Sequence, residues 1–225
     1  MLGLLKEQVK RLQKINKITS VNYDKKVVSQ VVIYIDNKAK YKLNENIIKS
    51  LDIYVGKELS DQEVEKIILE DKTVRGKEYL LRLFSRRIYS RYEISRKLNN
   101  KGYPENIIAN LIFWLENNNY INDELFASMW AQFRLQDKPI GRYKLNQELR
   151  IKGIKQEIIQ KVIDKTYNEI DELTLARNLI KEKIVSSEIK NVRINPRKIY
   201  NFLLRRGFSG EVSRNIYNEL NNKQA

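Results

Sequence analysis

The chain has 225 residues, of which 42% are hydrophobic, and this is enough to build one or two packed domains. It contains no Cys and no His, which excludes disulfides, thiolate or imidazole metal sites and histidine-based catalysis. The formal net charge is +15, which points to a polyanionic partner, either nucleic acid or an anionic membrane surface.

The positive charge is concentrated in the second part of the chain. Residues 1–73 carry 14 basic and 11 acidic side chains, whereas residues 74–225 carry 29 and 17. The longest apolar runs, 31–35 and 111–115, are far shorter than the ~20 residues that span a bilayer. The start of the chain also lacks the form of a secretory signal. We therefore expect a cytoplasmic protein without a membrane segment.

The first 73 residues predict a small α+β module. Residues 2–15 place leucine and valine at helical spacing, which predicts an amphipathic helix. Residues 17–43 instead alternate and are rich in β-branched side chains, which is typical of strands. Asp24-Lys25 and Asp36-Asn37-Lys38 have turn-forming sequences, so we expect a small antiparallel meander.

Two short helices should complete this module. The first is expected over residues 44–51 and is followed by a break at Gly56. The sequence Ser60-Asp61-Gln62-Glu63 has the form of a capping box, so the second helix should begin there. We expect the module to end near Lys72 and a separate helix to begin at residue 75.

Residues 74–225 repeat one pattern three times. Each copy has an amphipathic segment, a basic residue, a glycine, a hydrophobic residue and a second amphipathic segment. Counted from Gly102, Gly153 and Gly207, positions −8, −4, +1, +5 and +9 are apolar or aromatic and position −1 is Lys or Arg. A glycine directly after a helix commonly adopts a left-handed φ, so each glycine should end one helix before the next begins.

The repeated pattern predicts three helices per repeat and no strand. The expected helices are 75–89, 91–101, 104–118, 122–136, 142–152, 155–169, 171–185, 196–206 and 209–222. One repeat is too small to bury its apolar face, so stacked neighbours should form an elongated, curved array. The fold class is therefore mainly α, with three tandem three-helix repeats after the α+β module. The expected domains are 1–73, 74–119, 120–169 and 170–225.

Two groups of basic residues are candidates for contacts with DNA phosphates. The first group is in phase with the glycines, at position −1 or −11: Lys101, Lys152, Arg206, Arg91 and Arg142. Cations also stabilise the last turn of a helix, and a long Arg stem can cover the core, so binding and structural roles are about equally open for this group. The second group lies outside the phase and is the stronger candidate as a collective surface, although each member could be an ordinary solvated charge: Arg86, Arg87, Arg96, Lys97, Lys144, Arg150, Lys198 and Arg205.

Sequence-specific DNA reading and catalysis are both disfavoured. Two helices joined by a glycine turn suggest a helix-turn-helix motif, but residues 104–118 contain no Lys or Arg that could read bases. The pairs Asp123-Glu124 and Asp171-Glu172 could hold a metal for phosphodiester hydrolysis. Each pair lies at a predicted helix start, where acids stabilise the helix, so we interpret both as structural.

One stretch is rich in large apolar side chains at helical spacing: Leu111, Ile112, Phe113, Trp114, Leu115, Phe126, Met129, Trp130 and Phe133. Such residues are most often core, here at the junction of the first two repeats. A minority of them could instead form an edge that docks a protein.

Several short motifs follow one another in a fixed order: Ser90-Arg91-Tyr92-Glu93-Ile94, Lys97-Leu98, Lys101-Gly102-Tyr103, Tyr120-Ile121-Asn122-Asp123-Glu124-Leu125-Phe126-Ala127, Gly141-Arg142, Glu148-Leu149, Lys152-Gly153-Ile154, Phe202-Leu203 and Arg206-Gly207-Phe208. In this order they resemble the RecX family of recombination regulators, over roughly residues 16–222. The chain departs from the family at Ile94, where Leu is usual, and residues 1–14 have no counterpart.

This resemblance implies a non-enzymatic modulator of the RecA recombinase that lies in the groove of the RecA filament and limits its extension or promotes its disassembly. The implied partners are the RecA filament and single- and double-stranded DNA, with no membrane and no cofactor, and we expect a monomer. The alternative is a general DNA-binding repeat protein without sequence specificity. A metal-dependent nuclease is a distant third.

Overall fold

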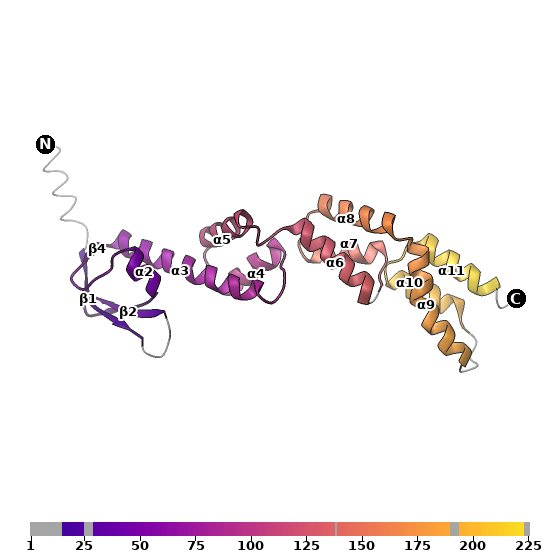
Figure 1. The fold of residues 1–225 in the computed structure, drawn as a ribbon, viewed down its shortest axis with the longest axis horizontal. Coiled ribbons are helices and arrows are strands. Elements are labelled where there is room, and N and C mark those ends of the chain that lie inside the picture. The colour runs from indigo at the N-terminus through magenta and orange to yellow at the C-terminus, as the bar shows by residue number, and fades with distance from the viewer. Residues whose placement is uncertain (1–14, 25–28, 138, 190–193, 223–225) are drawn as a thin grey trace. The chain divides into compact units, whose positions relative to one another are not determined.

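The computed structural model describes residues 15–24, 29–137, 139–189 and 194–222 (Figure 1). The chain divides into two compact units. The N-terminal unit comprises the chain up to Arg87 together with Leu98–Trp114, and the C-terminal unit comprises Ile88–Lys97 together with the chain from Leu115 onward. The helix predicted over residues 2–15 lies outside the described residues, apart from Ile15, which begins a strand.

The N-terminal unit contains a four-stranded antiparallel sheet in the order β3-β2-β1-β4. Its strands are β1 (Ile15–Tyr23), β2 (Gln30–Ile35), β3 (Ala39–Asn44) and β4 (Glu58–Ser60). In β2 every second side chain, Val31, Ile33 and Ile35, is buried, as expected for a sheet with one face on a core. Asp36 and Asn37 adopt φ of 50° and 57°, which closes the tight turn before β3. The predicted meander is confirmed, whereas β4 was not predicted.

Helices pack against the sheet (Figure 1). The short helix α2 (Glu45–Ser50) agrees with the helix predicted over 44–51, and Gly56 breaks the chain with φ of 99°. A small core joins these elements to the start of α3 (Asp61–Phe84): Ile18, Val31, Ile33, Leu43, Ile47, Ile48, Ile53, Leu59 and Ile67. Lys25 lies outside the described residues, and so does the turn predicted at Asp24-Lys25.

Helix α3 begins as predicted but continues further. The Glu63 carboxylate accepts the Ser60 N–H at 2.7 Å and the Glu63 N–H donates to Ser60 Oγ at 3.3 Å, so the capping box is present. The predicted end near Lys72 is wrong, because α3 is a single helix of 24 residues. Thr73 donates its hydroxyl to the Leu69 carbonyl at 2.9 Å, so this residue is satisfied within the helix. Gly76 is also compatible with the helix interior, since its bare Cα lies against the Leu111 side chain.

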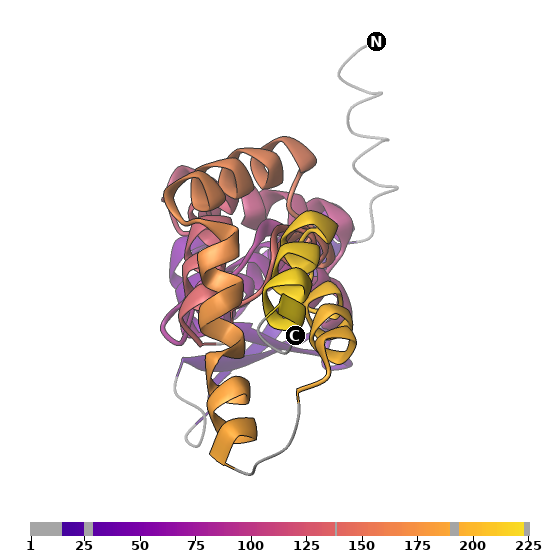
Figure 2. The same ribbon diagram turned by 90° about the vertical axis from the view of Figure 1, so that its right-hand side faces the viewer.

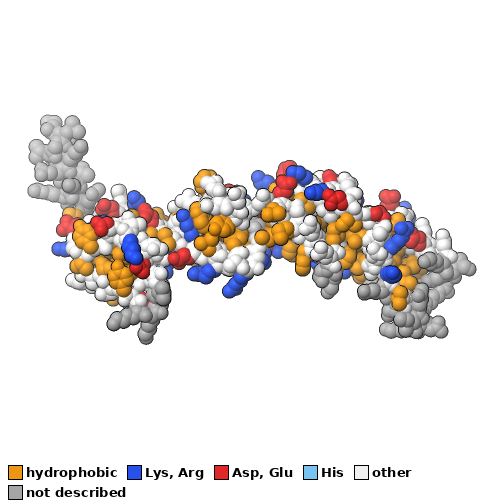
Figure 3. Space-filling model, viewed as in Figure 1, with side chains coloured by type: hydrophobic (Ala, Val, Ile, Leu, Met, Phe, Trp, Pro, Cys, Tyr) orange, Lys and Arg blue, Asp and Glu red, His pale blue; other side chains and the backbone are white. Residues whose placement is uncertain are grey.

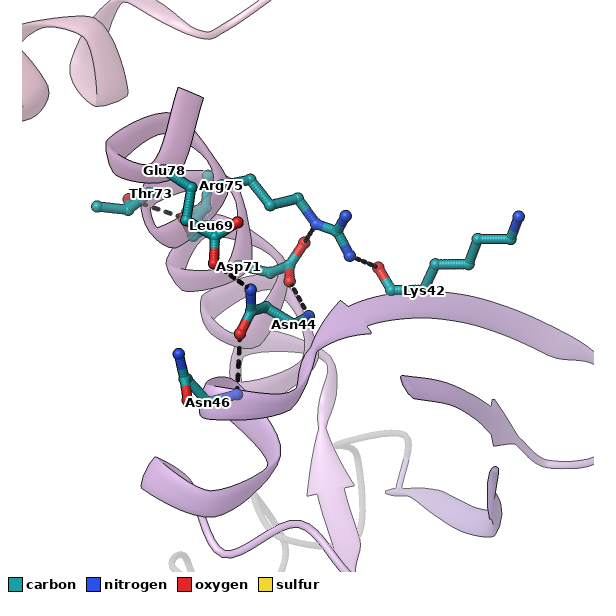
Figure 4. A network of polar contacts seen from close by, with 8 residues as sticks. All are labelled: Lys42, Asn44, Asn46, Leu69, Asp71, Thr73, Arg75 and Glu78. Atoms are coloured by element: carbon teal, nitrogen blue, oxygen red, sulfur yellow. Dashed lines mark hydrogen bonds and ion pairs between the residues drawn. The ribbon is translucent and has the colours of Figure 1, made fainter. Parts of the chain in front are cut away.

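A polar network attaches α3 to the end of β3 (Figure 4). Asp71, which is only 6% exposed, accepts the Asn44 N–H at 2.5 Å and Arg75 Nε at 2.7 Å. Arg75 also donates to the Lys42 carbonyl at 3.1 Å, and the Asn44 amide donates to Glu78 at 2.7 Å. The buried carboxylate is therefore both paired and hydrogen-bonded, which burial of a charge requires.

After β4 the described residues form only helices. Beyond α3 these are α4 (Arg91–Asn100), α5 (Glu105–Asn117), α6 (Asp123–Asp137), α7 (Arg142–Ile151), α8 (Gln156–Glu169), α9 (Glu172–Ile189), α10 (Pro196–Arg205) and α11 (Gly210–Asn222). Most bounds agree with the predicted ones to within a residue, although α3 ends before the predicted 89 and α9 continues past 185. None of the described helices is long and apolar enough to cross a membrane.

The repeated apolar phase corresponds to a repeated core. The leucines at position −4, Leu98, Leu149 and Leu203, are fully buried. The third repeat consists of α9, α10 and α11 (Figure 2, orange to yellow). Its buried core comprises Ala176, Ile180, Ile199, Leu203, Phe208, Ile216 and Leu220. The three-helix repeats predicted from the phase are confirmed.

Candidate nucleic-acid interface

All three repeats pass from their second to their third helix through the same hydrogen-bonded turn. Gly102, Gly153 and Gly207 adopt φ of 76°, 74° and 80°. In each turn the glycine N–H donates to the carbonyl three residues earlier, and the next N–H donates to the carbonyl five residues before it, at 2.8–3.2 Å. This is the Schellman motif, so the predicted left-handed glycines are confirmed.

The turns of the second and third repeats pack against the start of the preceding repeat's middle helix. Ser90, directly before α4, donates its hydroxyl to the Lys152 carbonyl at 2.7 Å. The N–H groups of Gly141 and Tyr143, at the start of α7, donate to two carbonyls of the third-repeat turn, both at 3.0 Å. The first N–H groups of a helix have no partner within it, so this turn completes the hydrogen bonding of α7.

At two of the three turns, this packing leaves no room for a side chain in place of the glycine. A Cβ at position 153 would overlap the Tyr92 side chain, and a Cβ at position 207 would overlap the backbone of Lys144. Nothing lies within 4 Å of a Cβ built at position 102. Gly102 is therefore required by its φ alone, whereas Gly153 and Gly207 are also required by the contact between repeats.

Acidic residues at the starts of α6 and α9 also connect neighbouring repeats. Asp123 accepts the backbone N–H of Arg91 at 2.9 Å. Glu172 is only 6% exposed and accepts both the N–H and Nε of Arg142 at 3.1 Å. Burial raises the pKa of Asp123 above its ordinary value, and the hydrogen bond from Arg91 opposes that shift. These two acids therefore cap the middle helix of the preceding repeat.

The other acid of each pair, Glu124 or Asp171, also has an interaction partner within the protein. Glu124 pairs with Lys161 at 2.7 Å. Asp171 accepts the N–H groups of Leu173 and Thr174 at 3.2 and 2.9 Å and so caps its own helix. Across the described parts of the chain, no three acidic side chains come together to hold a metal ion. These contacts support the structural interpretation of both acidic pairs.

Two of the basic residues in phase with the glycines lie over aromatic rings of the protein itself. Lys152 Nζ is 2.7 Å from the Glu93 carboxylate and 4.6 Å from the centre of the Trp130 ring. Lys101 Nζ is 4.6 Å from the centre of the Tyr79 ring. Both ammonium groups therefore gain a cation–π contact within the fold.

The three arginines in phase with the glycines have intramolecular contacts too. Arg91 pairs with Glu116, and Arg142 pairs with Glu172. The guanidinium of Arg206 packs 5.7 Å from the centre of the Phe202 ring. These contacts favour the structural alternative for the first group of basic residues, and their contact with DNA stays a prediction.

An open groove of about 730 Å³ lies between α7 and α10 in the C-terminal unit. Its lining residues are Tyr143, Lys144, Asn146, Gln147, Arg150, Ile151, Leu204, Arg205 and Gly207. Three residues of the second basic group, Lys144, Arg150 and Arg205, come together here from two different repeats. None of the lining residues is acidic, so the groove attracts anions.

The guanidinium groups of this basic groove are available for a ligand. Arg150 and Arg205 are exposed, and neither side chain forms an ion pair or hydrogen bond with any residue that the structure describes. Lys144 Nζ donates to Gln147 Oε1 at 3.0 Å, which leaves two of its three donors. Such donors suit phosphate oxygens, which a guanidinium can bind with two parallel hydrogen bonds.

The other residues of the second group do not line the basic groove: Arg86, Arg87, Arg96, Lys97 and Lys198. All except Lys97 are exposed. Lys97 is half-buried, and its Nζ lies 5.4 Å from the centre of the Tyr89 ring. Arg86 and Arg87 belong to the N-terminal unit, so the second group is not one continuous surface within a single unit.

The basic groove also contains exposed apolar residues that the repeat pattern does not predict. Tyr143, Ile151 and Leu204 are 64%, 68% and 40% exposed. They stand at positions −10, −2 and −3 from their glycines, outside the apolar phase of the repeat. A large apolar residue out of phase is therefore the sequence signal that could have identified them.

The aromatic-rich stretch divides between core and surface. Leu111, Ile112, Leu115 and Phe126 are buried as predicted, and Trp114 and Trp130 are half-buried, but Phe113, Met129 and Phe133 are 63%, 45% and 55% exposed. The core prediction is wrong for the last three, because helical spacing does not show whether a neighbour covers that face. Leu125, Met129 and Phe133 form an exposed apolar stripe on α6, where hydrophobic side chains gather in Figure 3.

Comparisons with known proteins match this chain to one family. The family model for the first three-helix domain of RecX matches residues 77–115, and the model for its second three-helix domain matches residues 122–163. A Regulatory protein RecX of Haemophilus ducreyi is 37% identical over 133 residues, which cover 59% of this chain and 84% of the relative. A Regulatory protein RecX of Clostridium acetobutylicum is 28% identical over 214 residues, covering 92% and 99%.

Two solved structures share the fold. A crystal structure of regulatory protein RecX has a TM-score of 0.64 at 22% identity, covering 90% of this chain and 99% of that one. The crystal structure of RecX from Lactobacillus salivarius has a TM-score of 0.53 at 26% identity, covering 68% and 98%.

Proposed function

Because the chain belongs to the RecX family of regulatory proteins, we propose that it is a non-enzymatic regulator of the RecA recombinase. It binds RecA–DNA filaments along their groove and limits their extension and activity in recombination, DNA repair and the SOS response. It acts as a monomer without a cofactor, and it contacts both the protein and the DNA phosphates of the filament.

The basic groove between α7 and α10 is the observation that carries this proposal. Arg150 and Arg205 have exposed guanidinium groups that no described carboxylate neutralises. Exposed apolar residues such as Tyr143 and Ile151 stand beside them. A surface that is both cationic and apolar suits a partner that is itself made of protein and DNA, since it can meet phosphates and side chains together.

A groove that recognises phosphates rather than bases should bind DNA without a preference for sequence. Helix α5, the third helix of the first repeat, carries no basic residue, so it is unsuited to reading base edges in the major groove. Binding that depends on phosphates weakens with salt, with a log–log slope of about −0.7 to −0.9 for each phosphate contacted. Single- and double-stranded DNA should therefore both bind, with affinities that fall steeply as salt rises.

A general DNA-binding repeat protein is the competing function, because the same groove would serve it. The two functions differ in the amount of protein required. The test is RecA ATP hydrolysis on single-stranded DNA, measured while this protein is added in amounts well below one copy per RecA subunit. A regulator of the filament changes hydrolysis at these ratios. A protein that only competes for DNA changes RecA ATP hydrolysis only when enough of it is present to cover most of the strand.

Catalysis is not part of the proposed function. Asp123 and Glu172 are engaged in capping, and the described residues offer no cluster of three metal ligands. Plasmid DNA incubated with the protein and magnesium or manganese should stay intact. Cleavage that disappears in an Asp123→Ala protein would overturn this part of the proposal.

A further inference from the structure

A second pocket, separate from the basic groove, lies between α10 and α11 of the third repeat. Its volume is about 380 Å³, and its lining residues are Arg197, Tyr200, Asn201, Arg214, Tyr217 and Asn218. Each of the two helices thus contributes one arginine, one tyrosine and one asparagine to the lining. None of these six residues was selected from the sequence.

The two arginines of this pocket differ from the paired arginines of the same unit. Arg177 on the neighbouring helix α9 forms an ion pair with Glu219, and Arg134 on α6 pairs with Glu148. Arg197 and Arg214 are exposed, and neither side chain has an ion pair or hydrogen bond with the residues that the structure describes. Two unneutralised guanidinium groups on one pocket favour an anionic ligand.

The two tyrosines give the pocket an aromatic wall. The rings of Tyr200 and Tyr217 lie 6.3 Å apart at an interplanar angle of 80°, so they support each other edge to face. Both side chains are half-buried, which leaves part of each ring on the pocket surface. A rigid, partly open ring beside a cation is the arrangement on which proteins stack the bases of single-stranded nucleic acid.

Helix α10 connects this pocket to the basic groove. Arg197, Asn201 and Arg205 follow each other at four-residue spacing, so they lie along one face of the helix, over roughly 12 Å of its axis. Arg197 and Asn201 line the pocket, whereas Arg205 lines the basic groove. An extended polyanion that occupies the groove can therefore continue along α10 into the pocket.

We propose that the pocket between α10 and α11 binds a nucleotide unit of single-stranded DNA, with the base against Tyr200 and Tyr217 and the phosphates on Arg197 and Arg214. This inference deepens the proposed function, on which it rests for the presence of DNA, by naming the form of DNA that the third repeat prefers. Duplex DNA does not enter the pocket, because its bases are already stacked on each other.

The experiment measures binding of the full-length protein to two fluorescent oligomers of equal length, one of thymidine nucleotides and one of abasic units with the same phosphates. Tyr200→Leu removes the ring and keeps the side chain apolar. It should weaken binding of the thymidine oligomer by roughly 5- to 100-fold and leave binding of the abasic oligomer unchanged. Tyr54→Leu, an exposed tyrosine of the N-terminal unit, is the matched control and should change neither.

The double variant Arg197→Gln and Arg214→Gln provides a second measurement, since both residues are exposed and the fold should tolerate the change. It should weaken binding of both oligomers and make the salt dependence less steep, because phosphate contacts are lost. Unchanged binding in the double variant, or equal losses for both oligomers in Tyr200→Leu, would refute the pocket as a nucleotide site. RecA is absent from both binding experiments, so a negative result would refute the nucleotide site alone. Regulation of RecA is tested separately by the ATP hydrolysis assay.

Discussion

Helix α7 uses arginine differently at its two ends. At its start, Arg142 pairs with the buried Glu172 of the following repeat. Near its end, Arg150 stands exposed in the basic groove without a described ion-pair partner. Arg142 has an equivalent in the first repeat, Arg91, whereas the residue equivalent to Arg150 there is Asn99. On this helix, the arginine that recurs in the first repeat holds two repeats together, and the arginine that does not recur is the better candidate for binding.

Gly207→Val should break the contact between the second and third repeats. The variant places a β-branched side chain at left-handed φ and against the backbone of Lys144, so we expect a loss of roughly 3 kcal/mol or more in the free energy of unfolding. Denaturation in guanidinium chloride measures it. Gly102→Val is the control, because it meets only the φ penalty of about 1–2 kcal/mol. Equal losses in the two variants would contradict the role of the contact.

Reversing three charges of the basic groove should have the next largest effect, on binding rather than on stability. Lys144→Glu, Arg150→Glu and Arg205→Glu together should lower affinity for DNA by roughly 30-fold, about 2 kcal/mol, and flatten its salt dependence. The melting temperature should stay nearly unchanged, because Arg150 and Arg205 are exposed, the half-buried Lys144 donates only to the Gln147 side chain, and such charges contribute little to stability.

A matched charge reversal outside the basic groove separates specific placement from total charge. Arg86→Glu, Arg96→Glu and Lys198→Glu change the net charge by the same amount on exposed residues that the groove does not include. DNA affinity should fall far less in this variant than in the groove variant. If the two variants lose affinity equally, the groove is no more than part of a diffuse positive surface.

The two ends of α7 can be compared with one kind of substitution. Arg142→Gln leaves the Glu172 carboxylate buried without its ion-pair partner. The free energy of unfolding should therefore fall by roughly 1–2 kcal/mol. Arg150→Gln should change stability by less than about 0.5 kcal/mol and should weaken DNA binding. Thermal unfolding and DNA titration of both variants measure the contrast. The opposite ranking in either assay would reverse the assignment of the two arginines.

The smallest effect is expected at Asp123, whose pKa is raised by burial. Asp123→Asn keeps an oxygen for the Arg91 N–H and removes the buried charge, so stability at neutral pH should change little. As pH falls, the folded wild type takes up a proton on Asp123 before the unfolded chain does. Wild type should therefore gain stability relative to the variant between the raised folded pKa and the ordinary pKa of an aspartate. Melting temperatures of both proteins across this range test the sign.

Features set by local sequence were predictable. The three turn glycines, the capping box of Ser60 and the buried leucines of the repeats depend on residues close in the chain, and each was found where expected. Strand β4 was not predictable in this way, since it has only three residues and pairs with Ile15–Lys17, far away in sequence.

The candidate site was predictable only in part, for a similar reason. Lys144, Arg150 and Arg205 were selected as charges without a structural explanation, but their meeting in one groove depends on how α7 and α10 pack. The role of Arg142 could not be read from its phase, because its partner Glu172 lies 30 residues further along the chain. The continuity of α3 past residue 72 could not be read from Thr73 and Gly76, which are both weak helix formers. Thr73 bonds within the helix to the Leu69 carbonyl, and Gly76 leaves room for the Leu111 side chain, which is distant in sequence.

The contact between repeats also has an evolutionary consequence. Gly141 begins α7 without a side chain that could cap it, so the second repeat borrows its cap from the third. Asn195 begins α10 and caps it with its own side chain, which accepts the Lys198 N–H at 3.2 Å. Helix α10 therefore has its own cap and needs no following repeat to supply one. Deletion of the third repeat would remove the two carbonyls that accept the Gly141 and Tyr143 N–H groups at the start of α7. Loss of the third repeat during evolution should therefore destabilise the second.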